Sequence, residues 1–161
     1  MTKSIDILNK IALVTGANRG IGKVIAESFL ENGAKKVYAA VRNTASANDL
    51  IEKYGDRVSA IKIDLAKPQT ITDAAKTASD TEIVVNNAGV LTSTTPLDSN
   101  AIENLNFEMD INVGGLIRMA QAFAPVLKQN GGGALIQLNS IASIKNFVPF
   151  TTYSASKAAA Y

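Results

Sequence analysis

The amino-acid sequence predicts an α/β protein, in which a doubly wound parallel sheet with strand order 3-2-1-4-5 carries helices on both faces. Three observations lead to this class. Short runs of β-prone apolar residues alternate along the chain with longer segments of helical periodicity. A glycine-rich turn joins the first apolar run to the first helical segment. No internal repeat or linker interrupts the alternation, so residues 1–161 are expected to form one domain.

The first half of this pattern starts with a buried strand at residues 11–14, followed by the glycine turn. The helix after the turn has one apolar face and ends at Gly33, a residue free to adopt a left-handed conformation. The apolar residues of this face are Ile21, Val24, Ile25 and Phe29. A second strand is expected at residues 37–41 and a second helix at residues 44–54.

The alternation then continues to the end of the sequence. The next elements are expected at 58–63 (strand), 68–78 (helix), 83–85 (strand), 100–128 (helix) and 134–138 (strand). The long helix shows an apolar stripe of Ile102, Leu105, Met109, Val113, Leu116, Ala120, Phe123 and Leu127. A last helix begins near Thr152 but is short, and the fifth strand would lie at a sheet edge. We therefore expect a domain that is incomplete at the C-terminus, or one that an oligomer covers.

Composition limits the chemistry available to the protein. The 161 residues are 47% hydrophobic, carry a net charge of +2, and include neither cysteine nor histidine. Disulfides, thiolate chemistry, cysteine-ligated zinc and Ser-His-Asp triads are excluded, so no metal site is expected. No apolar segment approaches 18 residues, the first ten residues lack a signal peptide's apolar stretch, and no basic block is present. A cytoplasmic protein that binds neither membrane nor nucleic acid is expected.

The glycine turn is the first candidate binding site. Its three glycines have the spacing Gly-x-x-x-Gly-x-Gly, between a strand and a helix start. Such a turn lets backbone N–H groups at the helix N-terminus bind a pyrophosphate, although a glycine-rich turn without a ligand is the alternative. The residues of this candidate site are Gly16, Asn18, Arg19, Gly20, Ile21 and Gly22.

The end of the second strand indicates which dinucleotide would bind. An NAD enzyme places an acidic residue there to accept the ribose 2′-hydroxyl, but this sequence has Val41 and Arg42. A guanidinium suits a 2′-phosphate, and Arg19 in the glycine turn adds a second cation. NADP (NADPH) is therefore expected, and NAD is less favoured. A solvated surface charge is the alternative for either arginine.

Candidate catalytic residues lie in the last third of the chain. Tyr153 and Lys157 are four residues apart at a helix start, so they share one face and form a plausible acid/base pair. Ser140 follows the fifth strand, where it can orient a carbonyl oxygen or cap the strand end. Asn112 lies on the apolar stripe of the long helix, where its amide holds ordered water beside Lys157 or bonds neighbouring backbone.

Together, these motifs resemble the classical short-chain dehydrogenase/reductase family. They are the turn at residues 15–22, Asn86-Asn87-Ala88-Gly89, Asn112, Ser140 and Tyr153-x-x-x-Lys157. The resemblance implies a Rossmann fold and an NADP-dependent oxidoreductase that moves hydride between nicotinamide and a carbonyl or alcohol. It also implies that Tyr153 is the general acid/base, Ser140 polarises the substrate oxygen, Lys157 binds the nicotinamide ribose and stabilises the tyrosinate, and Asn112 holds a proton-relay water.

The same resemblance adds residues on the adenosine side of the cofactor. Asp64 and Leu65, after the third strand, are expected at the adenine, while Asn87, Ala88 and Gly89 pack against the adenosine half. Tyr153 and Lys157 are also counted among the cofactor-binding residues. A strand-end cap for Asp64 and a plain turn for residues 87–89 are the alternatives.

Chain length is the departure from the family, whose members continue further. An NADP-binding protein without catalysis, or a subunit completed by another chain, therefore stand beside the reductase as alternatives. A homo-oligomer, dimer or tetramer, is expected of the full-length form. Apolar residues after the fifth strand favour a small apolar carbonyl or alcohol substrate, although a loop packing on its own core would look the same. These residues are Ile141, Ile144, Phe147, Val148 and Phe150.

Overall fold

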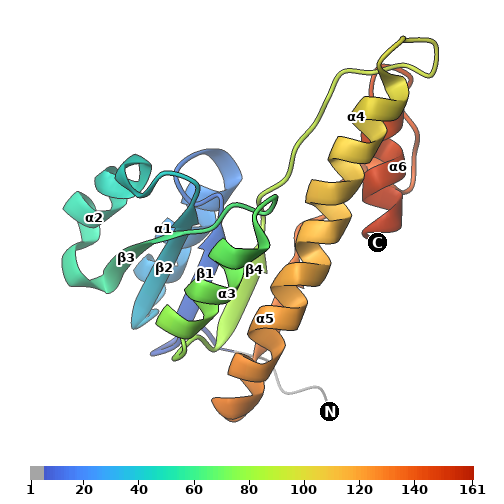
Figure 1. Ribbon diagram of the computed structural model, residues 1–161. Coiled ribbons are helices and arrows are strands. Elements are labelled where there is room, and N and C mark those ends of the chain that lie inside the picture. The colour runs from blue at the N-terminus through green and yellow to red at the C-terminus, as the bar shows by residue number, and fades with distance from the viewer. Residues whose placement is uncertain (1–5) are drawn as a thin grey trace.

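A five-stranded parallel sheet forms the centre of the molecule (Figure 1). The computed structural model describes residues 6–161, and its strand order is β3-β2-β1-β4-β5, so the predicted class and order are confirmed. All four neighbouring strand pairs are parallel. The strands are β1 (Ile11–Thr15), β2 (Lys36–Val41), β3 (Val58–Lys62), β4 (Ile83–Asn86) and β5 (Ala134–Gln137).

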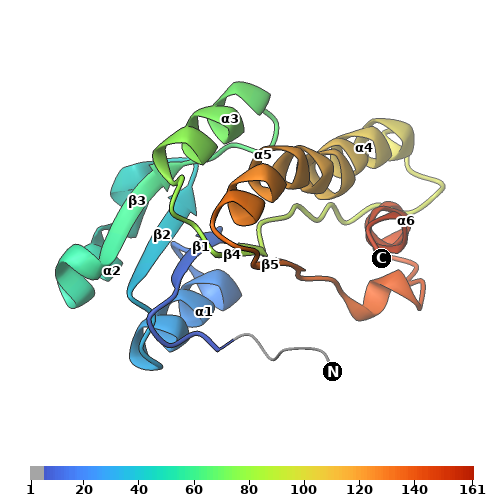
Figure 2. The same ribbon diagram turned by 90° about the horizontal axis from the view of Figure 1, so that it is seen from below.

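Helices cover both faces of the sheet, as Figure 2 shows. Helices α1 (Gly20–Glu31) and α2 (Asn48–Tyr54) lie on one face, and α3 (Pro68–Thr77) and α5 (Gly115–Gln129) lie on the other. Because side chains alternate along a strand, Ala12 and Val14 of β1 enter the first core while Leu13 enters the second. β1 is therefore buried on both faces of the sheet.

The long helix predicted at residues 100–128 contains a π-helical segment. It consists of α4 (Ala101–Glu108), the π-helical η3 (Met109–Gly114) and α5. The predicted apolar stripe is wrong at its start: Ile102 is 71% exposed, whereas Glu108, which lies outside the stripe, is buried. Asn112 is buried, as its predicted place on the stripe requires. Two causes are evident. The wider turns of η3 rotate the helix face, and α4 extends beyond the sheet, where it packs beside α6 (Figure 1).

The remaining segments refine the predicted boundaries. The helix expected at residues 44–54 starts as a 3₁₀ turn, η1 (Thr44–Ala47), before α2, and further 3₁₀ turns are η2 (Gly55–Arg57) and η4 (Ile141–Ser143). Helix α6 (Thr151–Ala159) packs beside α4 rather than on the sheet (Figures 1 and 2). Within residues 6–161, no helix combines the length and apolarity needed to cross a membrane.

Candidate functional site

The glycine turn between β1 and α1 has a geometry that requires glycine. Gly16 and Gly20 have φ angles of +68° and +54°, a region that L side chains rarely adopt. Gly22 is required for another reason, because a Cβ there would lie 2.3 Å from the carbonyl oxygen of Gly16. The turn is thus held close against the first turn of α1, with its N–H groups at the helix N-terminus.

Thr15 joins this turn to the loop after β4. Its hydroxyl accepts hydrogen bonds from the N–H groups of Asn87 at 3.0 Å and Ala88 at 2.9 Å. In return, Nδ2 of Asn87 donates to the carbonyl oxygen of Thr15 at 2.8 Å. Sequence reasoning gave Asn87 a place at the cofactor but missed Thr15. Its signal was a hydroxyl residue ending an otherwise aliphatic strand, directly before the turn.

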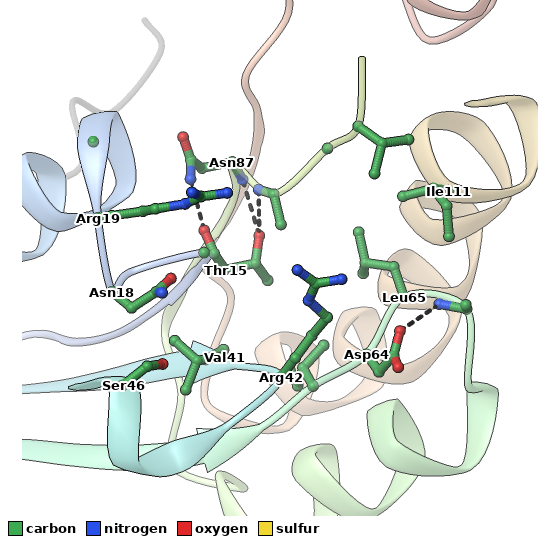
Figure 3. Close-up of a pocket in the computed structure, with 18 of the residues that line it drawn as sticks. Thr15, Asn18, Arg19, Val41, Arg42, Ser46, Asp64, Leu65, Asn87 and Ile111 are labelled. Carbon is green, nitrogen blue, oxygen red and sulfur yellow. Dashed lines mark hydrogen bonds between the residues drawn. The ribbon is translucent and has the colours of Figure 1, made fainter. Parts of the chain in front are cut away.

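A cavity of about 1060 Å³ opens at the carboxyl edge of the sheet (Figure 3). It brings together most of the residues that the sequence predicted at the cofactor: Gly16, Asn18, Arg19, Gly20, Ile21, Arg42, Asp64, Leu65, Asn87, Ala88 and Gly89. Gly22 lies behind the turn and is buried. Tyr153 and Lys157 are not among the lining residues. Residues that the prediction did not include, among them Asn43, Ser46, Val90 and Ile111, complete the walls.

Two guanidinium groups reach this cavity from different elements. Arg19 extends from the glycine turn and Arg42 from the end of β2 (Figure 3). Both side chains are exposed, and among residues 6–161 neither forms an ion pair. Ser46 also lines the cavity, and its hydroxyl donates to the Asn43 carbonyl oxygen at 2.6 Å. The β2 end of the cavity is therefore suited to an anionic group.

Asp64 and Leu65 form another side of the same cavity. The Asp64 carboxylate accepts a hydrogen bond from the N–H of Ala66 at 3.1 Å, which is the cap that the simpler alternative anticipated. Arg118 on α5 holds Leu65 by donating to its carbonyl oxygen at 2.9 Å. The Leu65 side chain rests against Gly115, where a Cβ would lie 3.0 Å from that of Leu65. Leu65 is thus fixed as an apolar wall.

Lys157 and Tyr153 lie on one face of α6. Nζ of Lys157 donates to the carbonyl oxygen of Leu138 at 3.0 Å and lies 6.0 Å from the centroid of the Tyr153 ring. Burial lowers the pKa of Lys157 below its ordinary value. The Lys157 carbonyl accepts from Nδ2 of Asn139, next to Ser140, at 3.3 Å. These contacts fasten α6 to the carboxyl end of β5.

Asn112 lies in η3 and uses its amide fully. Its Oδ1 accepts from the Val90 N–H at 2.9 Å, while Nδ2 donates to the Val90 carbonyl oxygen and to Oγ of Ser156, each at 2.9 Å. Of the two interpretations of Asn112, hydrogen bonding of its amide to nearby backbone is therefore the one that describes its contacts. A Cβ on Gly89 would lie 2.9 Å from Oδ1 of Asn112, so Gly89 permits the close approach.

Ser140 shows the capping geometry that was its alternative interpretation. Its Oγ accepts a hydrogen bond from the N–H of Ala142 at 3.1 Å at the start of η4. The hydroxyl proton has no acceptor among residues 6–161, so it is available to a carbonyl oxygen. Tyr153 and Lys157 thus lie on α6, Asn112 is bonded to α6, and Ser140 lies in the segment after β5 that is attached to α6. None of these four residues lines the cavity.

Comparison with known proteins yields a consistent group of relatives. A family model described as short chain dehydrogenase matches residues 10–161. An uncharacterized oxidoreductase of Staphylococcus aureus (strain MRSA252) is 32% identical over 159 residues, covering 96% of this chain and 68% of that protein. The 7alpha-hydroxysteroid dehydrogenase of Escherichia coli (strain K12) is 33% identical over 158 residues, covering 94% and 61%.

Solved structures of a dehydrogenase and a reductase are also similar to this chain. A short chain dehydrogenase from Burkholderia cenocepacia J2315, in complex with NADP, has a TM-score of 0.89 and 38% identity, covering 97% of this chain. L-sorbose reductase from Gluconobacter frateurii, complexed with NADPH and L-sorbose, has a TM-score of 0.86 and 30% identity, covering 97% of this chain. This chain spans 64% and 62% of the lengths of those two chains.

Proposed function

Because the chain belongs to the short chain dehydrogenase family, we propose that it is an oxidoreductase that uses NADP(H) to interconvert a small carbonyl compound and its alcohol. The observation that carries the proposal is the cavity at the carboxyl edge of the sheet. It surrounds one space of about 1060 Å³ with the glycine turn, the two arginines and the loop after β4. Ligands of doubly wound sheets bind at this edge.

The residues present fit a dinucleotide with a 2′-phosphate. The Gly16–Gly20 turn offers backbone N–H groups for the pyrophosphate, and the Arg42 guanidinium offers donors for the 2′-phosphate. Leu65 and Asp64 would hold the adenine, and Asn87 to Gly89 the adenosine half. The NADP and NADPH bound to the Burkholderia and Gluconobacter proteins support this assignment.

NADPH, when bound, supplies the hydride for reduction. Tyr153 gives its phenolic proton to the substrate oxygen, or takes it back in the reverse direction. The Ser140 hydroxyl donates a hydrogen bond to the same oxygen and thereby polarises the carbonyl. The ammonium of Lys157, on the same face of α6, stabilises the negative charge that develops on the tyrosine oxygen.

An apolar substrate agrees with the surface beside this group. Ile141, Ile144 and Val148, between β5 and α6, are 60%, 71% and 68% exposed. Ile141 follows Ser140 directly, and η4, which begins at Ile141, packs against α6. We therefore propose an aldehyde or ketone with an apolar substituent as the substrate class.

The experiment that tests the proposal combines binding and turnover on the same preparation. NADPH binding is followed by its fluorescence, and NADPH oxidation is followed with a panel of apolar aldehydes and ketones. We expect saturable binding and turnover with members of the panel. Saturable binding without any turnover would favour a protein that binds NADP without catalysis, while failure to bind NADPH would refute the cofactor assignment.

A further inference from the structure

The extended segment at residues 90–94, after β4, lies between the long helix and α6. On its helix side, Glu108 is the last residue of α4, and its Oε1 accepts hydrogen bonds from the N–H of Thr92 at 2.6 Å and from the Thr92 hydroxyl at 2.8 Å. Four residues later, Asn112 holds both backbone groups of Val90 in the same way. Glu108 and Asn112 thus form hydrogen bonds with Thr92 and Val90, which are two residues apart in this segment.

The same segment is attached to α6 on its other side. The N–H of Thr151 donates to the Thr94 carbonyl oxygen at 3.1 Å, and the Thr94 hydroxyl donates to the Thr92 hydroxyl at 3.1 Å. The Thr92 and Thr152 hydroxyls are 3.4 Å apart, a longer contact than a normal hydrogen bond. Asn104 on α4 closes the set by donating to the Thr94 hydroxyl at 2.7 Å. The Thr94 hydroxyl thus donates to the Thr92 hydroxyl, which donates to Oε1 of Glu108. Because this carboxylate oxygen accepts, it fixes the direction in which both hydroxyls donate.

The spacing of these contacts matches the spacing of the proposed catalytic pair. Asn112 reaches α6 at Ser156, and Ser156 is followed by Lys157. Glu108 reaches α6 through Thr92 at Thr152, and Thr152 is followed by Tyr153. One turn of helix separates Glu108 from Asn112, and one turn separates Thr152 from Ser156.

Glu108 is fully buried, which is unusual for a carboxylic side chain. Its side chain is 0% exposed, none of the ion pairs among residues 6–161 includes it, and its Oε2 has no hydrogen-bond partner within that range. A carboxyl group in such surroundings is costly to bury. What it provides is an acceptor for two donors of Thr92, which an apolar side chain of similar size cannot replace.

We propose that Glu108 is a positioning residue for Tyr153. Through Thr92 and Thr94 it sets where the first turn of α6 lies against the long helix, and thereby where the phenol stands relative to the substrate oxygen. The inference rests on the proposed reductase activity. It assigns Glu108 an acceptor function, so the amide of glutamine should replace it and an aliphatic side chain should not.

The test compares E108L with E108Q, and uses E103L, at an exposed position of the same helix, as the matched control. The measured quantity is kcat per NADPH-binding site, which corrects for any loss of folded protein. In E108L we expect this value to fall about tenfold or more, with the Kd for NADPH changed by less than about threefold. In E108Q and E103L we expect both quantities within about threefold of the wild-type values.

Three results would overturn the inference: an E108L variant with wild-type kcat per site, an E108Q variant as impaired as E108L, or a loss in E108L that is confined to NADPH affinity. If E108L fails to fold, T92V removes the hydroxyl that links Glu108 to Thr94 and Thr152 but keeps the Thr92 N–H donor, and it should lower kcat per site in the same direction. If the wild type turns over no carbonyl, the proposed function fails separately. The ¹³Cζ resonance of Tyr153 then decides, because it should move in E108L and return in E108Q, and an unmoved resonance would overturn the inference.

Discussion

Nδ2 of Asn87 lies 2.4 Å from the position that a Cβ on Gly22 would occupy, so the loop after β4 and the first turn of α1 meet with no room for a methyl group. This contact fixes the glycine turn against the loop after β4, because the same amide donates to the Thr15 carbonyl oxygen at 2.8 Å. The position of the glycine turn thus depends on two segments that are far apart in the sequence.

Gly22→Ala should therefore weaken NADPH binding. The new methyl group would push the Gly16 backbone or Asn87 out of place, and overpacking of this kind costs about 1–3 kcal/mol. A Kd for NADPH that rises about tenfold or more, measured by fluorescence titration, is expected. Gly55→Ala is the control, because Gly55 has open space around it and a positive φ of +59°, so this variant reports backbone strain without a steric clash. Equal losses of affinity in both variants would contradict the steric explanation.

Arg42→Asp should reverse the cofactor preference towards NADH. Hydrogen bonds to charged groups contribute about 1.5–3 kcal/mol, so the ratio of NADPH to NADH affinities should fall roughly 10-fold to 100-fold. Lys62→Asp makes the same charge change at the exposed end of β3, outside the cavity lining, and should leave the ratio nearly unchanged. Unaltered relative affinities in Arg42→Asp would refute a role for Arg42 at the 2′-phosphate.

The ion pair between Lys10 and Glu82 gives a prediction for stability against pH. Burial acts to raise the pKa of Glu82, but the hydrogen bonds from Lys10 at 2.6 Å and from the N–H of Ile11 at 3.1 Å outweigh it and lower that pKa below 4.5. The carboxylate therefore stabilises the fold above pH 4.5, and this stabilisation is lost as the pH falls through the lowered pKa.

Glu82→Gln should accordingly reduce the free energy of unfolding at neutral pH by about 1 kcal/mol or less, since water partly screens Lys10. In urea unfolding the difference from the wild type should disappear in acid. A difference of constant size across that range would contradict the assignment.

Lys157 should show the same trend in a separate pH window that ends at its ordinary value of 10.5, because burial lowers its pKa. Below the lowered pKa, the folded and unfolded chains both carry the charge. Between that pKa and 10.5 the unfolded chain binds a proton that the folded chain has lost, so the wild type gains stability as the pH rises. The free energy of unfolding of Lys157→Met should thus fall relative to the wild type over this window. Lys128→Met, at an exposed position on α5, controls for removal of a lysine, and a flat difference for Lys157→Met would refute the effect of burial.

The sequence predicts the sheet well because its signals are local. β1 and β4 are aliphatic runs that end in one polar residue, and the turn between β1 and α1 is marked by glycines whose backbone angles require them. The long helix is a different case. Periodicity assumes a regular α-helix packed on an apolar layer, whereas α4 projects beyond the sheet and its inner face meets a polar segment and α6. The burial of Glu108 therefore follows from tertiary contacts that no local pattern contains.

The candidate site likewise contains some residues that local sequence patterns predict and others that they do not. Residues that neighbour one another in sequence, such as those of the glycine turn, were identified from spacing and line the cavity. Thr15 and Ser46 were missed because their importance comes from contacts made across the fold or around the cavity edge. For Ser140 and Asn112, the simpler capping and backbone-bonding alternatives describe the side-chain contacts, and their proposed roles in catalysis remain predictions.

The most direct measurement follows deuterium from C4 of the nicotinamide of NADPH to the carbonyl carbon of a substrate, in the wild type and in Tyr153→Phe. We predict transfer by the wild type. In Tyr153→Phe, NADPH binding should be unchanged and the transfer rate should fall by about 100-fold or more, the usual effect of removing a general acid. Transfer at an undiminished rate by Tyr153→Phe, or NADPH binding by the wild type without transfer to any carbonyl of the panel, would contradict the account.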